Sequence, residues 1–180
     1  YVTLEPCSHH GKTPPCSDAL IAAGVSEVII AMQDPFPKVA GSGVAALQKA
    51  GIAVRSGLMA AHAEKLNEGF ISRVKRGRPF VRLKIACSLD GCTAMSDGQS
   101  EWISGAEARA DVQRFRAASG AIITGVGTVL ADDPSMTVRD KTLTDLQPLR
   151  VILDSRLRMP LSACMLTLPG QTAVFCIDDN

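Results

Sequence analysis

The sequence carries almost no net charge. Its 19 Lys and Arg residues against 18 Asp and Glu residues give a formal charge of +1 over 180 residues. The two signs are mixed throughout, which argues against a bulk nucleic-acid binder, because such a protein needs a basic face. The sequence also has no apolar run of the ~18 residues needed to cross a bilayer. It shows no signal sequence in which a basic segment is followed by an apolar one. We therefore expect a cytoplasmic protein that binds neither nucleic acid nor membrane.

A dense cysteine framework, typical of small secreted scaffolds, is also missing. There are six cysteines, at positions 7, 16, 87, 92, 164 and 176. Without a leader they imply a reducing compartment, so some or all of them should be free thiols or metal ligands. The chain opens without Met inside a strand pattern and stops directly after an apolar run. We therefore expect a fragment of a longer protein.

Strand and helix patterns alternate along the whole chain, which predicts an α/β fold in both halves. Apolar runs predict strands over residues 1–5, 26–32, 52–55, 80–87, 120–126, 151–154 and 173–177. Helical spacing predicts helices over residues 17–23, 43–50, 60–74 and 104–118. The basic, Gly- and Pro-marked stretch 75–79 is the candidate boundary, so we predict domains over residues 1–76 and 77–180.

Two local signals concern the second half. Ser104 and Glu107 have the spacing of a capping box, in which two side chains bond free N–H groups at a helix start. The run Gly125-Val-Gly-Thr128 ends a strand pattern with a turn, where a backbone can approach a pyrophosphate closely. It is not the Rossmann glycine pattern, and a plain tight strand exit is the alternative.

The segment from Pro6 to Cys16 lies between a predicted strand and a predicted helix. Cys16 would start that helix, whose partial positive charge lowers a thiol pKa and favours thiolate. With Cys7 it would supply half of a tetrahedral zinc site. Zinc deaminases complete such a site with a His and an activated water, and a Glu shuttles the protons. The alternative is a pair of buried structural cysteines beside a turn.

This cysteine loop resembles the deaminase domain of the bifunctional riboflavin-pathway enzymes, diaminohydroxyphosphoribosylaminopyrimidine deaminase / 5-amino-6-(5-phosphoribosylamino)uracil reductase. The resemblance lies in Thr3-Leu-Glu-Pro-Cys-Ser-His9 and Gly11-Lys-Thr-Pro-Pro-Cys16, and it continues through residues 34–43 and 50–54. It implies a cytidine-deaminase-like three-layer domain with Cys7 and Cys16 as zinc ligands. It also implies substrate contacts from His9 and Lys12, which as loop residues could equally be only solvated.

In that family the zinc His and the catalytic Glu form a His-x-Glu motif upstream of the cysteine loop. This region lies outside the chain. The run His62-Ala-Glu64 has the same pattern, but it lies downstream on a predicted helix, where the family has no ligand. We interpret His62 as a solvated helix residue.

The second half resembles the reductase domain of the same family, which has a dihydrofolate-reductase-like α/β fold. The matching segments are 82–91, 100–104 and 125–139. Positions that line the NADPH site in the family correspond to Ala86, Trp102, Thr128, Asp132 and Ser155. Positions that hold the phosphoribosyl substrate correspond to Ser100, Arg116, Met136 and Arg139. We expect Lys84 and Asp132 to be the polar groups nearest the reacting sugar.

Structural alternatives exist for three of these positions. Trp102, the only Trp, could pack in a core. Arg116 could be a solvated charge or a helix-dipole partner, because it falls late in a predicted helix. Lys84 could be a solvated residue at a strand edge.

The resemblance implies two incomplete domains and two reactions in riboflavin biosynthesis. A zinc-dependent hydrolysis removes the exocyclic amine of 2,5-diamino-6-ribosylamino-4(3H)-pyrimidinone 5′-phosphate. An NADPH-dependent reduction then converts the ribosyl chain of the product to ribityl. We expect Zn²⁺ and NADPH as cofactors, a small phosphoribosyl pyrimidine as substrate, and a homo-oligomer. The alternatives are a nucleoside- or tRNA-type deaminase fused to an unrelated domain, and an inactive zinc-stabilised scaffold.

Overall fold

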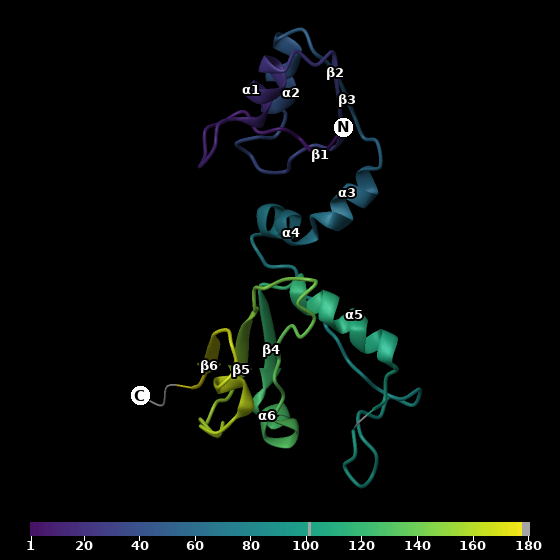
Figure 1. The fold of residues 1–180 in the computed structure, drawn as a ribbon, viewed down its shortest axis with the longest axis vertical. Helices are drawn as coiled ribbons and strands as arrows, with labels where there is room; N and C mark the ends of the chain where they lie inside the picture. Colours follow the sequence, from purple (N-terminus) through teal and green to yellow (C-terminus); the bar gives the residue numbers. More distant parts are fainter. Residues whose placement is uncertain (101, 178–180) are drawn as a thin grey trace. The chain divides into compact units, whose positions relative to one another are not determined.

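Two three-stranded parallel sheets organise the chain, one in each of two units, Tyr1–Lys84 and Ile85–Asn180 (Figure 1). The computed structural model describes residues 1–100 and 102–177. Helices connect strands in both units, which confirms the predicted mixed α/β class. Within the described residues no helix has the length and apolar character needed to cross a membrane. The boundary between residues 76 and 77 stays a prediction.

The first unit opens with a βαβαβ run. Its elements are β1 (Val2–Leu4), α1 (Cys16–Ala22), β2 (Glu27–Met32), α2 (Ser42–Lys49) and β3 (Ala53–Ser56). The strand order is β1-β2-β3 and both pairings are parallel. Parallel neighbours need a crossover between them, and the two helices supply it. The carboxyl ends of all three strands therefore lie at one edge of the sheet.

One face of the β1-β2-β3 sheet carries the core of the first unit. Val28 and Ile30 of β2 pack with Leu47 of α2 and with Ile52, and Leu20 of α1 packs against the same cluster. Helices α1 and α2 lie side by side (Figure 1). Both helices therefore cover the same face, and the loops that lead into them emerge together.

The single helix predicted over residues 60–74 is two helices. They are α3 (Ala60–Leu66) and α4 (Glu68–Arg76), which meet at Asn67. Asn67 has φ −112° and ψ 18°, and its side-chain amide donates to the carbonyl of Ala63 at 2.8 Å. Asn side chains compete with the helical ladder in this way, and the periodicity of the apolar positions does not reveal it.

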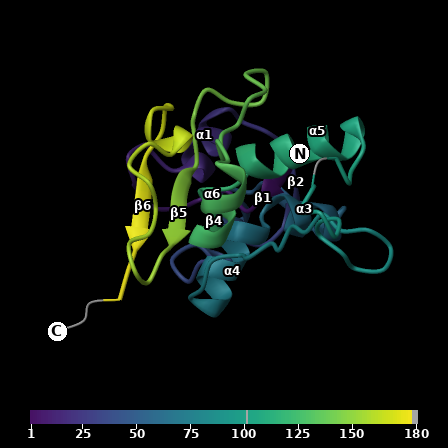
Figure 2. The same ribbon diagram turned by 90° about the horizontal axis from the view of Figure 1, so that it is seen from below.

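The second unit begins with α5 (Ala106–Ala117) and continues as a βαβ unit and a further strand. These later elements are β4 (Ala121–Gly125), α6 (Val126–Asp132), β5 (Leu149–Leu153), a 3₁₀ turn (Cys164–Leu166) and β6 (Thr172–Phe175). The strand order is β4-β5-β6, again all parallel, and Figure 2 shows β5 and β6 running in the same direction. Val126 and Val129 of α6 pack with Ile152 of β5 and with Met136 and Met165 to form the core.

Two local predictions for the second unit are wrong. Helix α5 has Gly105 as its N-cap and no side-chain capping bond, so Ser104 and Glu107 do not form a capping box. The Ser104 carbonyl instead accepts from the guanidinium of Arg109. Gly127 and Thr128 do not form a turn. Gly125 is extended, with φ −85° and ψ 155°, and leads directly into α6.

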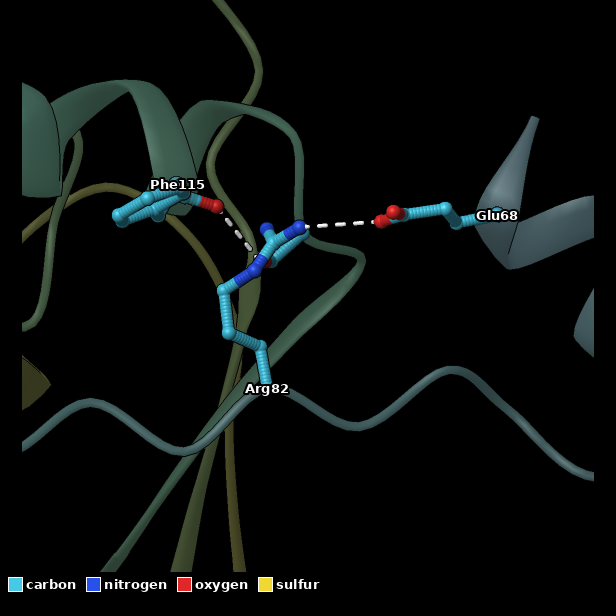
Figure 3. A network of polar contacts seen from close by, with 4 residues as sticks. Glu68, Arg82 and Phe115 are labelled. Atoms are coloured by element: carbon cyan, nitrogen blue, oxygen red, sulfur yellow. Dashed lines mark hydrogen bonds and ion pairs between the residues drawn. The ribbon is translucent and has the colours of Figure 1, made fainter. Parts of the chain in front are cut away.

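The strand predicted over Phe80–Cys87 is absent, because residues 79–88 pair with no strand in the described part of the chain. The apolar side chains of its alternating pattern are exposed, at 80% for Val81 and 82% for Leu83. Alternation produces a strand only where a partner strand supplies hydrogen bonds and a cover for the apolar face. Here Arg82 pairs with Glu68 of α4 at 3.2 Å (Figure 3).

Gly43→Ala is predicted to destabilise the first unit. A methyl group at Gly43 would sit 1.9 Å from the carbonyl oxygen of Pro6, so the α2 start and the cysteine loop would have to separate. Such overpacking costs about 1–3 kcal/mol of unfolding free energy, measured by urea denaturation. Gly69→Ala in α4 is the matched control, because nothing lies within 4 Å of the added methyl. It should be neutral or gain up to about 1 kcal/mol. Equal stability of the two variants would contradict the close contact.

Candidate functional site

Cys7 and Cys16 lie together at the carboxyl edge of the first sheet. Cys7 follows β1 by three residues, and Cys16 is the first residue of α1. The backbone N–H of Cys16 donates to the Cys7 sulfur at 3.4 Å, and that of Ser17 donates to the Cys7 carbonyl at 3.1 Å. The loop of eight residues between the two cysteines therefore closes on itself and brings both thiols to one corner.

The pKa of Cys16 is raised, whereas its place at a helix start predicted a lowered value. The largest cause is a side-chain hydrogen bond with Cys7, followed by the charge of that neighbouring thiol. The pair of sulfurs thus outweighs the partial positive charge at the start of a seven-residue helix. In the described part of the chain, no group of three or more His, Cys, Asp or Glu side chains could hold a metal.

His9 and Lys12 are exposed on the loop between the two cysteines. Both side chains face solvent and are accessible to a ligand. His62 and Glu64 are both exposed on α3, as expected for solvated helix residues.

The carboxyl edge of the second sheet holds two of the positions predicted to bind cofactor. Thr128 lies in α6 directly after β4, Ser155 follows β5 by two residues, and both are exposed. Asp132 is exposed at the end of α6. In open parallel sheets this edge is the usual place for ligands. The backbone of Ser155 is itself fixed, because its carbonyl accepts from the N–H of Ile177 at 3.4 Å.

Lys84 and Ala86 lie in the extended segment that precedes α5. Lys84 is exposed and belongs to the first unit, and Ala86 is half-buried in the second unit. Lys84 is therefore not at a strand edge, which was the alternative interpretation of it.

Trp102 does not pack in a core. It is 65% exposed, and the guanidinium of Arg109 lies 4.4 Å from its ring centre. An Arg above an indole face is a cation–π contact, which holds the flat ring on the surface. Ser100 is half-buried and lies close by in sequence, on the other side of residue 101, which is outside the described residues.

Arg116 and Arg139 are two neighbouring cations. Arg116 on α5 is half-buried and donates to the carbonyl of Thr137 at 2.8 Å. Burial, and then the positive charge of Arg139, lower the pKa of the Arg116 guanidinium. Arg139 is exposed, and its backbone N–H donates to the side chain of Gln113, one helical turn before Arg116, at 2.8 Å. Among residues 1–100 and 102–177, neither arginine pairs with a carboxylate. Two adjacent cations without a counter-ion suit an anionic ligand.

Met136 was predicted to contact substrate, but its side chain is buried at 5% exposure in the core of the second unit. Its φ of 47° is in the left-handed region. Any contact from this position to a ligand would therefore come from its backbone.

The family model described as the RibD C-terminal domain matches residues 79–179, which is more than half of the chain. The chain belongs to the RibD C-terminal domain family. It is 52% identical to the riboflavin biosynthesis protein RibD of Escherichia coli over 183 residues, which covers 96% of this chain and 50% of that protein. It is 53% identical to RibD of Haemophilus influenzae, over 88% of this chain and 46% of that protein.

Solved RibD structures agree with the fold. A Thermotoga maritima diaminohydroxyphosphoribosylaminopyrimidine deaminase / 5-amino-6-(5-phosphoribosylamino)uracil reductase superposes with a TM-score of 0.89 at 39% identity, over 99% of this chain and 50% of that one. RibD of Acinetobacter baumannii superposes with a TM-score of 0.87 at 50% identity, over 97% and 50%. The chain thus spans about half the length of its RibD relatives.

This RibD-family chain also has buried polar groups that the sequence analysis missed. Glu5, Arg150 and Asp154 are 3%, 1% and 1% exposed. Arg150 donates to the hydroxyl of Thr172 at 3.0 Å and to the carbonyl of Gly170 at 2.7 Å. The sequence does contain a signal for these residues, because each charge lies inside or directly after an apolar strand pattern. A charge in such a place is rare unless hydrogen bonds or an opposite charge stabilise it.

Asp154→Asn is predicted to make the melting temperature depend less on pH in the acidic range. Burial raises the pKa of the Asp154 carboxyl, but the backbone N–H groups of residues 158, 159 and 156 outweigh it and leave the pKa below its usual range. A lowered pKa stabilises the fold above the unfolded-state value of ~3.9, and this contribution is lost as pH falls through the folded value.

The measurement is the melting temperature between pH 7 and pH 2. The exposed Asp145→Asn is the control, and it should keep the wild-type profile. Asp154→Asn should melt lower at pH 7 and lose less on acidification. Parallel profiles for the wild type and Asp154→Asn would contradict this assignment.

Proposed function

We propose that the full-length protein containing this chain is a bifunctional enzyme of riboflavin biosynthesis. It removes the exocyclic amine of a diaminopyrimidine ribosyl phosphate and then reduces the ribosyl chain of the product to ribityl. The Thermotoga maritima relative is named for both activities, and the likeness covers 99% of this chain. The proposal rests mainly on one observation. Cys7 and Cys16 are brought together, with the Cys16 N–H bonded to the Cys7 sulfur, in a chain that closely matches these relatives.

The donor set at this corner fits zinc. Two thiols held by one strand–helix connection are soft ligands that zinc accepts at two of four tetrahedral positions. Cys7 and Cys16 would hold the metal, and the remaining ligands would come from outside this chain. Bound zinc supplies the Lewis acidity for hydrolytic deamination. His9 and Lys12, exposed on the same loop, would contact the pyrimidine and the ribose phosphate.

NADPH would bind along the carboxyl edge of the second sheet. Thr128 and Ser155 offer exposed hydroxyl groups there, which suits a phosphate-bearing ligand. Ala86, Trp102 and Asp132 would complete the cofactor-binding residues. The cofactor supplies the reducing equivalents, and the protein orients it against the sugar.

The phosphoribosyl substrate would bind at the arginine pair. Arg116 and Arg139 lack a carboxylate partner in the described part of the chain, so their charges are available to a phosphate. Ser100 and the backbone of Met136 would position the rest of the substrate. Lys84 and Asp132 are proposed as the polar groups that hold or move protons at the reacting sugar.

Cys7→Ser in the full-length protein is predicted to abolish zinc binding and deamination while reductase activity remains. A serine hydroxyl is a poor replacement for a thiolate on zinc. Zinc per chain is measured by atomic absorption, and the two reactions are assayed separately. Cys87→Ser, an exposed thiol in the second unit, is the matched control, together with His62→Ala. Both controls should keep their zinc. Stoichiometric zinc in Cys7→Ser would overturn the assignment.

Arg139→Ala is predicted to raise the reductase KM about 10- to 100-fold, because a charge-assisted contact contributes ~1.5–3 kcal/mol to binding. NADPH affinity and the deaminase step should stay close to wild type. Arg139→Lys should recover only part of the loss, since Lys keeps the charge but not the planar fork. The readouts are steady-state kinetics and NADPH titration.

Arg114→Ala is the matched control for this experiment. Arg114 lies on α5 and is exposed beside Asp111 at 3.4 Å, so its removal should not change KM. If Arg139→Ala weakened NADPH binding as much as substrate binding, Arg139 would belong to the cofactor site instead.

A further inference from the structure

Glu5 is a buried carboxylate that is satisfied entirely by backbone N–H groups. It directly follows β1 and is 3% exposed. One oxygen accepts from Asp34 at 3.2 Å and Gly41 at 3.0 Å. The other accepts from Gly43 at 3.0 Å and Val44 at 3.2 Å. The last two donors belong to the first turn of α2, whose N–H groups have no partner within the helix.

The residues on both sides of Cys7 touch the start of α2. The carbonyl of Pro6 lies so close to Gly43 that a methyl group there would be 1.9 Å away. The hydroxyl groups of Ser8 and Ser42 are hydrogen-bonded at 2.7 Å. Glu5, Pro6 and Ser8 thus fix the backbone around Cys7 against residues 34–44 from another part of the sequence.

These contacts determine where the Cys7 sulfur lies relative to Cys16. The Cys7 carbonyl accepts from Ser17, and its sulfur accepts from the N–H of Cys16. A shift of residues 5–8 would therefore separate two thiols that now share one corner. A buried carboxylate with four donors holds its position strongly, because any movement leaves both the charge and the donors unsatisfied.

We propose that Glu5 is a positioning residue for the metal ligand Cys7. Its carboxylate fixes the cysteine loop to the start of α2 and so sets the geometry in which Cys7 and Cys16 bind zinc. This inference rests on the proposed function of the two thiols. Residues that orient metal ligands typically change metal affinity about 10- to 100-fold when substituted.

The test is zinc affinity of Glu5→Gln in the full-length protein, measured by competition with a chromophoric chelator. Gln keeps the shape of Glu but points an NH₂ group at two N–H donors, so zinc should dissociate at least ~10-fold more readily. Reductase activity should stay near wild type, which reports that the second unit is folded, and an unchanged circular-dichroism spectrum reports the same for the first unit. Glu27→Gln is the matched control, because Glu27 is an exposed carboxylate of the same sheet, paired with Arg55 at 2.7 Å. It should bind zinc like the wild type.

Amide hydrogen exchange distinguishes a role of Glu5 in positioning Cys7 from a role in local stability alone. Glu5→Gln should lose protection at the amides of Gly41, Gly43 and Val44 together with zinc affinity. Lost protection with wild-type zinc affinity would overturn the proposal. If Glu5→Gln does not fold, Ser8→Ala takes its place. It removes only the bond to Ser42 and should weaken zinc about two- to tenfold. Unchanged affinity in a folded Ser8→Ala protein would then also overturn it.

Cys7→Ser, measured in parallel, distinguishes failure of the proposed zinc-binding function from failure of the proposed role of Glu5. If Cys7→Ser keeps its zinc, the proposed function of the thiols fails. If Cys7→Ser loses zinc while Glu5→Gln binds it as tightly as the wild type, only the role of Glu5 fails.

Discussion

Parallel strand pairing is the constraint on which the rest of the structure depends. Val2 pairs with Ile30 and Leu4 with Met32, and the N–H of Glu5 extends the ladder to the carbonyl of Met32 at 3.0 Å. Because the strands run in the same direction, the segments that leave β1 and β2 emerge at one edge. The cysteine loop and residues 34–44 therefore lie against each other. In the second unit, the parallel pairing of β4 with β5 likewise places Thr128 and Ser155 at one edge of the sheet.

Buried charges in both units are bound to backbone groups of loops, and in the described residues none of them pairs with an opposite charge. Glu5 holds residues 34–44, Asp154 holds residues 156–159, and Arg150 holds the carbonyls of Leu168 and Gly170. Burying a charge is costly unless hydrogen bonds replace its contacts with water, so these bonds restrain each of the loops. One atom of Arg150 and one of Asp154 still lack a partner within the described residues. Two of these charges directly adjoin residues to which we assign function, because Glu5 precedes Cys7 by two residues and Asp154 precedes Ser155.

The sequence predicted what depends on local pattern. β2 and β5 were found because both are nearly continuous apolar runs, and the cysteine loop was found because its motif is specific. The strand over residues 80–87 was wrong because alternation says nothing of whether a partner strand is present. The helix over residues 60–74 was wrong because Asn67 interrupts it with its own side chain. The four bonds of Glu5 could not be predicted, since they join residues 29 to 39 positions apart.

The same limit applies to the candidate site. Family resemblance supplied Arg116 and Arg139, but only the structure shows that they are adjacent, because Arg116 lies on α5 and Arg139 follows α6. Likewise, the helix position of Cys16 predicted a lowered pKa, whereas the neighbouring Cys7 raises it. In both cases the property depends on a contact between residues that are not neighbours in sequence, which the local sequence pattern does not reveal.

If Cys7 and Cys16 are half of a zinc site, as we propose, X-ray absorption at the zinc edge of the full-length protein should reveal their two sulfur atoms directly. The zinc should have two sulfur neighbours at about 2.3 Å and two nitrogen or oxygen neighbours at about 2.0–2.2 Å. Substitution of Cys7 or Cys16 should remove this signal. Four sulfur neighbours, or a purified active protein without zinc, would show that Cys7 and Cys16 do not form half of such a site.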